Sequence, residues 1–99
     1  MKRGENMTDV IKRNGKKEPF KPQKLRKSIE NAVTDAGFTV TKQMKAIEHA
    51  SQDAEKLAMG RNEISSKDLR NEIVNDLESD SPKVAQAWRN YEKQHGTKF

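Results

Sequence analysis

The chain has 99 residues, a length that suits one domain, and 35% of them are charged; it has no cysteine, which excludes disulfides, zinc fingers and zinc ribbons. No apolar run approaches the roughly 20 residues that span a membrane, and the start MKRGENM lacks the apolar core of a secretory signal, so we expect a soluble, cytoplasmic protein. The net charge of +5 comes from residues 1–27, which hold ten Lys or Arg and three Asp or Glu, and this asymmetry indicates an anionic partner or a solvated basic arm.

The first predicted element is a hairpin, which follows a disordered tail over residues 1–7. Asn14-Gly15 lies between two short runs that carry apolar residues, and Asn-Gly favours a two-residue type I′ turn with positive φ at both positions. We therefore place strands near residues 8–13 and 16–19. Pro19 cannot donate a ladder hydrogen bond, so the second strand ends there or lies at an edge of the sheet.

Four helices are predicted to follow. Pro22 opens the first, Gly37 ends it, and apolar residues at helical spacing extend the second from about Val40 to Met59. Ile64 indicates a short third strand. The sequences SSKD and SP, which begin at Ser65 and Ser81, are typical of the starts of a third and a fourth helix.

The predicted fold class is α+β, a small two- to three-stranded β-sheet with an Asn-Gly hairpin that caps a four-helix bundle. A lone hairpin is marginally stable in water, so the sheet must pack on the helices. The single domain is expected to cover residues 8–95, and residues 96–99 to form a frayed tail.

The sequence shows no catalytic constellation. It has neither a G-x-x-x-x-G-K-[ST] loop nor G-x-G-x-x-G. Its two histidines, His49 and His95, lie far apart and have no evident partners. We therefore expect neither an enzyme nor a protein metal site.

Basic residues beside the hairpin favour the binding of an anion. Lys12 and Arg13 follow the first strand and Lys24 lies in the first turn of the first helix, so the three could converge where free N–H groups attract an anion. Glu18 lies among them. A nonspecific nucleic-acid surface gains nothing from a carboxylate, whereas a nucleotide site can use one to accept from a ribose hydroxyl or an amino group. From the residues alone, three interpretations remain open: a nucleotide-binding site, a nonspecific nucleic-acid-binding surface, and solvated surface charges.

The segment VIKRNGKKEPFKPQKLRKSI resembles the opening of the ATP-cone domain, and EISSKDLRNEIVNDL and VAQAWRNYEK are similar to its strand-then-helix segment and its last helix. The resemblance covers about residues 8–94. It implies a non-catalytic regulatory domain that binds ATP or dATP and shifts oligomeric state, as in ribonucleotide reductase large subunits and the repressor of their genes. By match to the motif, Val10 would line the base pocket, Glu18 would contact the nucleoside, and phosphates would meet Lys12, Arg13 and Lys24. Ser66 and Lys93 are further nucleotide-binding candidates.

Two departures from the family pattern widen the alternatives. Lys21 stands where the family often has Asp or Asn beside the nucleoside, so it is a candidate contact that makes the site more positive. No reductase domain or zinc ribbon follows in this sequence, so a stand-alone cone would act on a ribonucleotide reductase subunit, on another regulated chain or on a second copy of itself. Mg²⁺ carried by a triphosphate takes most of its ligands from water and phosphate, so no protein metal site is required. The alternatives are a small basic nucleic-acid-binding protein and an inactive cone that serves as an oligomerisation or partner-binding module.

Overall fold

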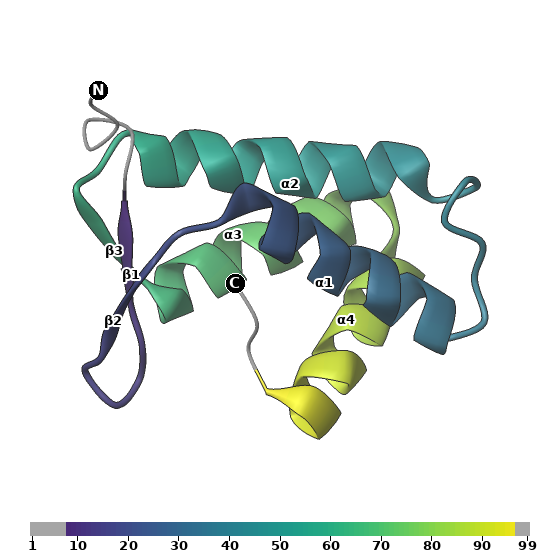
Figure 1. Ribbon diagram of the computed structural model, residues 1–99. Coiled ribbons are helices and arrows are strands. Elements are labelled where there is room, and N and C mark those ends of the chain that lie inside the picture. Colours follow the sequence, from purple (N-terminus) through teal and green to yellow (C-terminus); the bar gives the residue numbers. More distant parts are fainter. Residues whose placement is uncertain (1–7, 97–99) are drawn as a thin grey trace.

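The computed structural model describes residues 8–96 and shows three short strands at one end of an arrangement of four helices (Figure 1). The elements run in the order β1 (Asp9–Ile11), β2 (Lys17–Pro19), α1 (Pro22–Asp35), α2 (Met44–Met59), β3 (Glu63–Ser65), α3 (Ser66–Asp80) and α4 (Pro82–His95). The predicted α+β class is thus confirmed. The tails expected at residues 1–7 and 96–99 lie outside the described residues, apart from Gly96. Within the described part of the chain, no helix combines the length and the apolar character that a bilayer crossing requires.

The sheet is mixed, with the strand order β2-β1-β3. β1 pairs antiparallel with β2, with Val10 opposite Glu18, and parallel with β3, with Val10 opposite Ile64. The side chains of Val10 and Ile64 are 0% and 2% exposed, so burial of this face fixes the register. β2 lies at an edge of the sheet, where Pro19 is tolerated.

The hairpin turn differs from the predicted one. The Lys12 N–H donates to the Lys16 carbonyl at 2.8 Å, and the Gly15 N–H donates to the Lys12 carbonyl at 2.9 Å, so three residues form the loop. Gly15 has φ +89°, but Asn14 does not have positive φ, as a type I′ turn requires. The two-residue prediction is therefore wrong. The Asn14 side chain accepts from the Lys16 N–H at 3.1 Å, a local bond that stabilises the longer loop.

The helix boundaries match the predicted signals except at the start of α2. Gly37, with φ +89°, follows the end of α1 as expected. α2 begins at Met44 rather than at about Val40, because residues 39–43 form turns in which the Gln43 N–H donates to the Thr39 and Val40 carbonyls. The β-branched residues 39–41 and the lack of a side-chain cap at Gln43 make this segment a poor helix start.

The caps of the last two helices differ from each other. The Ser65 hydroxyl accepts from the Asp68 N–H at 3.0 Å, so the predicted N-cap of α3 is confirmed. Ser81 occupies the N-cap position of α4, ahead of Pro82, but its side chain makes no capping hydrogen bond. Among the four helices within residues 8–96, α3 is therefore the one whose first turn has a side-chain cap.

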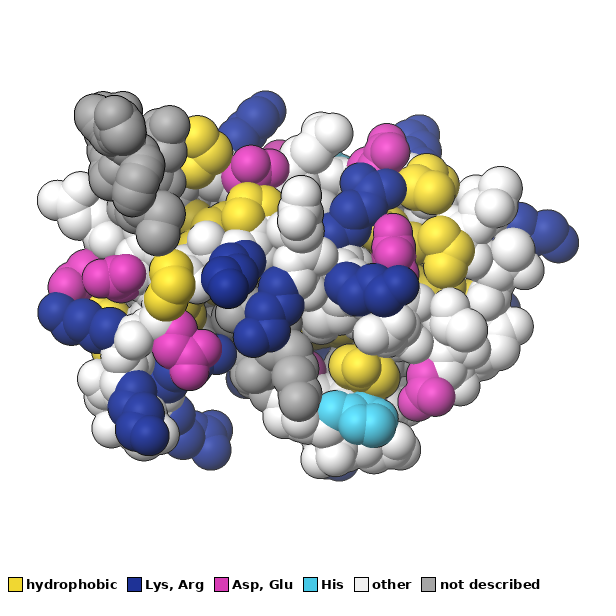
Figure 2. Space-filling model, in the orientation of Figure 1, with side chains coloured by type: hydrophobic (Ala, Val, Ile, Leu, Met, Phe, Trp, Pro, Cys, Tyr) yellow, Lys and Arg dark blue, Asp and Glu magenta, His cyan; other side chains and the backbone are white. Residues whose placement is uncertain are grey.

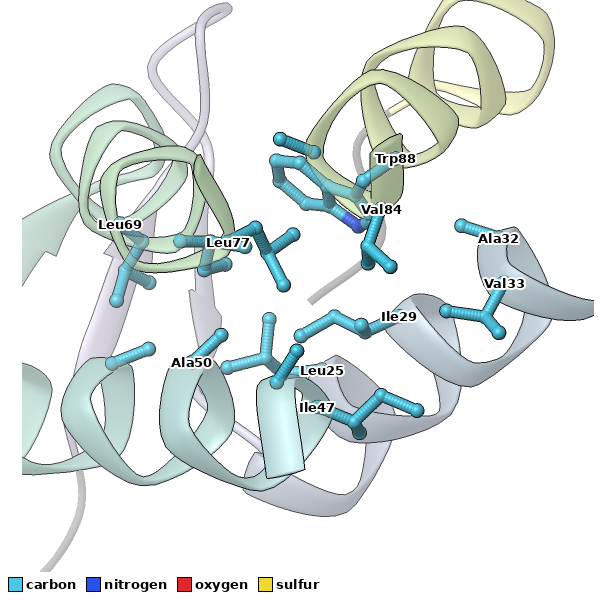
Figure 3. Close-up of a cluster of buried hydrophobic side chains, with 14 of the residues drawn as sticks. Leu25, Ile29, Ala32, Val33, Ile47, Ala50, Leu69, Leu77, Val84 and Trp88 are labelled. Atoms are coloured by element: carbon cyan, nitrogen blue, oxygen red, sulfur yellow. The ribbon is translucent and has the colours of Figure 1, made fainter. Parts of the chain in front are cut away.

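The hydrophobic core lies between the helices. Figure 3 shows Trp88 of α4 above Ile29 of α1, with Leu77 of α3 and Ile47 of α2 on the other sides. The Trp88 side chain is completely buried, and its Nε1–H donates to the Ser28 hydroxyl at 3.3 Å. This core anchors α3 and α4, so the polar side chains on their outer faces keep a defined position relative to the hairpin.

Candidate functional site

A basic cavity of about 1410 Å³ lies between the hairpin, the start of α3 and the second half of α4. Typical small-molecule sites have volumes of roughly 300–1,000 Å³, so there is room for a large polar ligand. Six Lys or Arg residues and two Glu residues line the cavity. Figure 2 shows Lys and Arg side chains gathered over the hairpin, at the lower left, and over α1. This balance of charge favours an anionic ligand.

The hairpin supplies one enclosed cation, one exposed cation and one carboxylate. The Lys12 side chain is 19% exposed, and its Nζ lies 3.8 Å from Oε1 of Glu18. Arg13 is exposed and lines the same cavity. Glu18 is about half exposed, so its carboxylate can turn toward a hydroxyl or amino group of a ligand while the cations hold the anionic part.

The first turn of α3 borders the cavity through Ser65, Ser66 and Lys67. N–H groups in the first turn of a helix lack intrahelical partners, and the helix dipole favours an anion there. The sequence predicts that the hairpin cations lie beside the start of α1, but in the structure they lie beside the start of α3. The parallel pairing of β1 with β3 explains the difference, because it sets Ser65 opposite Ile11.

Further along α3 and on α4, two arginines that line the cavity are paired with glutamates. The Arg70 Nε–H donates to Oε1 of Glu92 at 2.6 Å, and the Glu92 side chain is only 7% exposed. Arg89 of α4 pairs with Glu78 of α3. Lys93 is exposed and completes the basic lining.

The cavity brings together five of the predicted site residues, namely Lys12, Arg13, Glu18, Ser66 and Lys93. The other three lie elsewhere. Val10 is 0% exposed in the core, Lys21 is exposed ahead of α1, and Lys24 lines a second cavity.

Eight lining residues are not among the predicted site residues, and three of these, Ile11, Arg70 and Glu92, differ in how clearly the sequence signals them. Ile11 lies on the strand face opposite the buried Val10. Because side chains alternate along a strand, the sequence could have indicated this placement. Arg70 follows Ser66 by four residues, so it lies on the same helix face. Glu92 has no such signal, because its burial depends on Arg70 from a different helix.

The second cavity, of about 350 Å³, lies between α1 and α4. Its lining residues are Lys24, Lys27, Ser28, Asn31, Tyr91 and His95. The rings of Tyr91 and His95 are 4.4 Å apart, and the Asn31 amide donates to the Tyr91 hydroxyl at 3.5 Å. Lys24 therefore lines a different cavity from Lys12 and Arg13, although the sequence predicts that the three converge.

One histidine and three aspartates form a cluster between α2 and α3. His49 Nδ1 lies 2.8 Å from Asp80 Oδ2, and His49 Nε2 lies 3.2 Å from Asp53 Oδ2. The hydrogen bond with Asp80 raises the pKa of His49. Burial, followed by the hydrogen bond with Asp53 and its charge, raises the pKa of Asp76 to about 7.

The donor atoms of His49, Asp53 and Asp76 lie within 4.8 Å of one another, so these residues could share a metal ion. The ion pairs of the His49 imidazole with Asp53 and Asp80 also explain part of this arrangement without a metal ion. Partners for His49 were not predicted from the sequence. The spacing of four residues from His49 to Asp53, and from Asp76 to Asp80, is the signal that places each pair on one helix face.

The family model of the ATP cone domain matches residues 8–97. The matched range includes every strand and helix that the structure describes. No curated protein and no solved structure matches the chain significantly.

Proposed function

The chain belongs to the ATP-cone domain family, whose members are regulatory, non-catalytic domains that bind adenine nucleotides, and we propose that this chain binds ATP or dATP in the cavity between the hairpin, α3 and α4. The observation that carries the proposal is the lining of that cavity. Cations from three separate elements, two carboxylates and a helix N-terminus meet in one space.

The phosphate chain is proposed to lie at the first turn of α3, among Lys12, Arg13 and Lys93. Ammonium and guanidinium groups form charge-assisted hydrogen bonds with phosphate oxygens, and these bonds are stronger than those between neutral groups. The Ser66 hydroxyl and the N–H groups of the first turn add neutral donors. Enclosure of the Lys12 side chain, which is 19% exposed, makes its charge less screened by water than that of the outer lysines.

The nucleoside is proposed to lie against Ile11 and Glu18. Ile11 offers an apolar surface at the cavity wall, and Glu18 can accept from a ribose hydroxyl or from the adenine amino group. Mg²⁺ carried by the triphosphate needs few protein ligands, so the proposal requires no metal site in the chain. Lys21 and Lys24 lie outside this arrangement, and Lys24→Ala tests whether the second cavity also holds phosphate.

We further propose that the bound nucleotide acts on a second chain, either a ribonucleotide reductase subunit or another regulated protein, or changes the association of this chain with itself. A regulatory domain without catalysis can only act through such a difference in contacts between its free and bound states. Sedimentation of the chain with ATP and with dATP measures the self-association, and pull-down with reductase subunits measures the partner.

Calorimetric titration with ATP, dATP and ADP tests the proposed site. We expect Lys12→Ala to weaken ATP binding about tenfold or more, because a hydrogen bond to a charged group contributes about 1.5–3 kcal/mol. Lys16→Ala is the matched control. Lys16 carries the same charge in the same hairpin, directly after the loop, but it is exposed and does not line the cavity.

Tripolyphosphate and a short duplex DNA, each at two salt concentrations, separate the proposal from its alternatives. Saturable binding of adenine nucleotides that tripolyphosphate cannot match supports the nucleotide site. Equal losses of ATP affinity in Lys12→Ala and Lys16→Ala, together with DNA binding that weakens as the salt concentration rises, would instead indicate nonspecific binding of polyanions.

A further inference from the structure

Glu92 is a nearly buried carboxylate inside a cavity that otherwise favours anions. Its side chain is 7% exposed, and it lines the cavity from α4 beside Lys93. A buried carboxylate is costly unless it is paired and hydrogen-bonded. An unpaired Glu92 would also repel any phosphate that enters the cavity, so its pairing matters to both the free protein and the bound one.

Arg70 provides that pairing from α3. Its Nε–H donates to Glu92 Oε1 at 2.6 Å, a charge-assisted bond at the short end of the usual range. The Arg70 side chain is 47% exposed and lines the cavity, and a guanidinium has five N–H donors. Arg70 therefore contacts the buried carboxylate and the ligand space at once.

The other ion pairs at this site are arranged differently. Glu18, the partner of Lys12, is 48% exposed and 3.8 Å away, so it can turn into water at little cost. Glu78, the partner of Arg89, is 44% exposed and is not among the residues that line the cavity. Glu92, in contrast, cannot turn into water, because the surrounding protein buries it.

We propose that Glu92 is a built-in competitor of the phosphate chain for Arg70, so that it sets the nucleotide concentration at which the cavity fills. In the free protein, Glu92 holds Arg70 and neutralises part of the positive potential. A triphosphate binds by drawing Arg70 toward its oxygens, against the attraction and the charge of Glu92. This inference rests on the proposed function, since it concerns the same site and the same ligand.

Glu92→Gln is the direct test. The amide keeps the shape of the side chain and its ability to accept from Arg70, but it removes the charge. We expect ATP and tripolyphosphate to bind about tenfold more tightly to this variant, a change within the usual range of interaction between residues of one ion-pair network. Glu30→Gln is the matched control, because it removes the same charge from an ion pair with an arginine, Arg26, and neither residue of that pair lines the cavity, so we expect it to change the affinity less than about twofold.

The double variant Arg70→Gln with Glu92→Gln tests whether the effect runs through Arg70. If Glu92 competes for Arg70, its removal in the Arg70→Gln background raises the affinity by clearly less than the tenfold expected in the parent, so the two substitutions are not additive, and the gain that remains measures the direct repulsion between Glu92 and phosphate. Glu92→Asp keeps the charge but shortens the side chain, and we expect an intermediate affinity. This variant also serves if Glu92→Gln does not fold.

The outcomes separate this inference from the proposed function. ATP binding by the parent chain with equal affinity in Glu92→Gln, or an equal gain in Glu30→Gln, overturns the competitor role and leaves the nucleotide site standing. Weaker binding by Glu92→Gln also overturns it. If neither the parent nor any variant binds ATP, the proposed function fails, and this inference fails with it.

Discussion

Gly15 is the residue on which the conformation of the hairpin loop depends. Its φ of +89° lies in a region that residues with a Cβ atom rarely adopt, although a Cβ built there meets no atom within 4 Å. Strain in the backbone, rather than a clash, is therefore the cost of a side chain. We expect Gly15→Ala to lower the free energy of unfolding by about 1 kcal/mol, measured by urea denaturation.

Gly60 is the matched control for that substitution. Its φ is −80°, and the nearest atom to an added Cβ is a carbonyl oxygen at 3.7 Å, an ordinary contact. We expect Gly60→Ala to leave the stability unchanged or to raise it by up to about 1 kcal/mol, because it restricts the unfolded chain. An equal loss in both variants would mean that the positive φ at Gly15 is not what makes glycine necessary.

At the scale of residues, the sequence predicts the site in part. Lys12, Arg13 and Glu18 could be placed together because the hairpin is a local structure, and hairpin neighbours follow from spacing along the chain. Lys24 could not be separated from them, because its position depends on how α1 packs against α4. Glu92 could not be found at all, because a buried ion pair between two helices leaves no periodic signal.

Among the helices, α3 joins the sheet to the cavity. It follows β3 directly, and its N-cap Ser65 accepts from the Asp68 N–H at 3.0 Å. We expect Ser65→Ala to lower the free energy of unfolding by about 1 kcal/mol, because one N–H of the first turn loses its acceptor. Thermal and urea unfolding followed by circular dichroism measure the change.

Ser81→Ala is the comparison at the start of α4. Ser81 occupies the same position in its helix but makes no side-chain capping bond, so we expect a change within about 0.5 kcal/mol. A loss as large as that of Ser65→Ala would contradict this difference between the two helix starts. Sequence alone cannot make the distinction, since both segments have Ser ahead of an apolar helical stripe.

Element types could be predicted well because local sequence signals mark most of the helix ends. Pro22, Gly37 and Pro82 mark starts and stops that act on the local backbone, and the structure has helices at those places. The late start of α2 at Met44 and the three-residue loop at Gly15 were missed. In both segments, hydrogen bonds within a turn determine the backbone conformation. The spacing of apolar residues along the sequence gives no sign of these bonds.

At the scale of the whole molecule, a basic cavity and a cluster rich in aspartate lie at different places in the fold. The basic cavity lies at the hairpin end, whereas His49, Asp53, Asp76 and Asp80 lie together between α2 and α3. The acidic residues of the second half are spread along the sequence, and only the packing of two helices brings these four side chains together. The N-terminal excess of cations was visible in the sequence, but this acidic cluster was not.

The acidic cluster makes the stability of the protein depend on pH. Burial, together with the hydrogen bond and charge of Asp53 and with the charge of Glu72, raises the pKa of Asp76 from 3.8 to about 7, and His49 opposes the shift. The folded state thus holds the proton of Asp76 more tightly than the unfolded state does. This contribution to stability is complete below about pH 4 and is lost as the pH rises through about 7.

Asp76→Asn isolates this contribution, because the amide stays neutral at every pH. We expect the variant to become more stable relative to the parent as the pH rises from about 4 to 8, since the parent must then either ionise a half-buried carboxyl or keep its proton at increasing cost. Urea denaturation at a series of pH values, in buffer with EDTA so that no divalent cation replaces the proton, measures the difference. Asp35→Asn, at the exposed end of α1, is the control that should show little trend. A difference between Asp76→Asn and the parent that stays constant across this range would mean that Asp76 ionises in the folded protein as readily as in the unfolded chain.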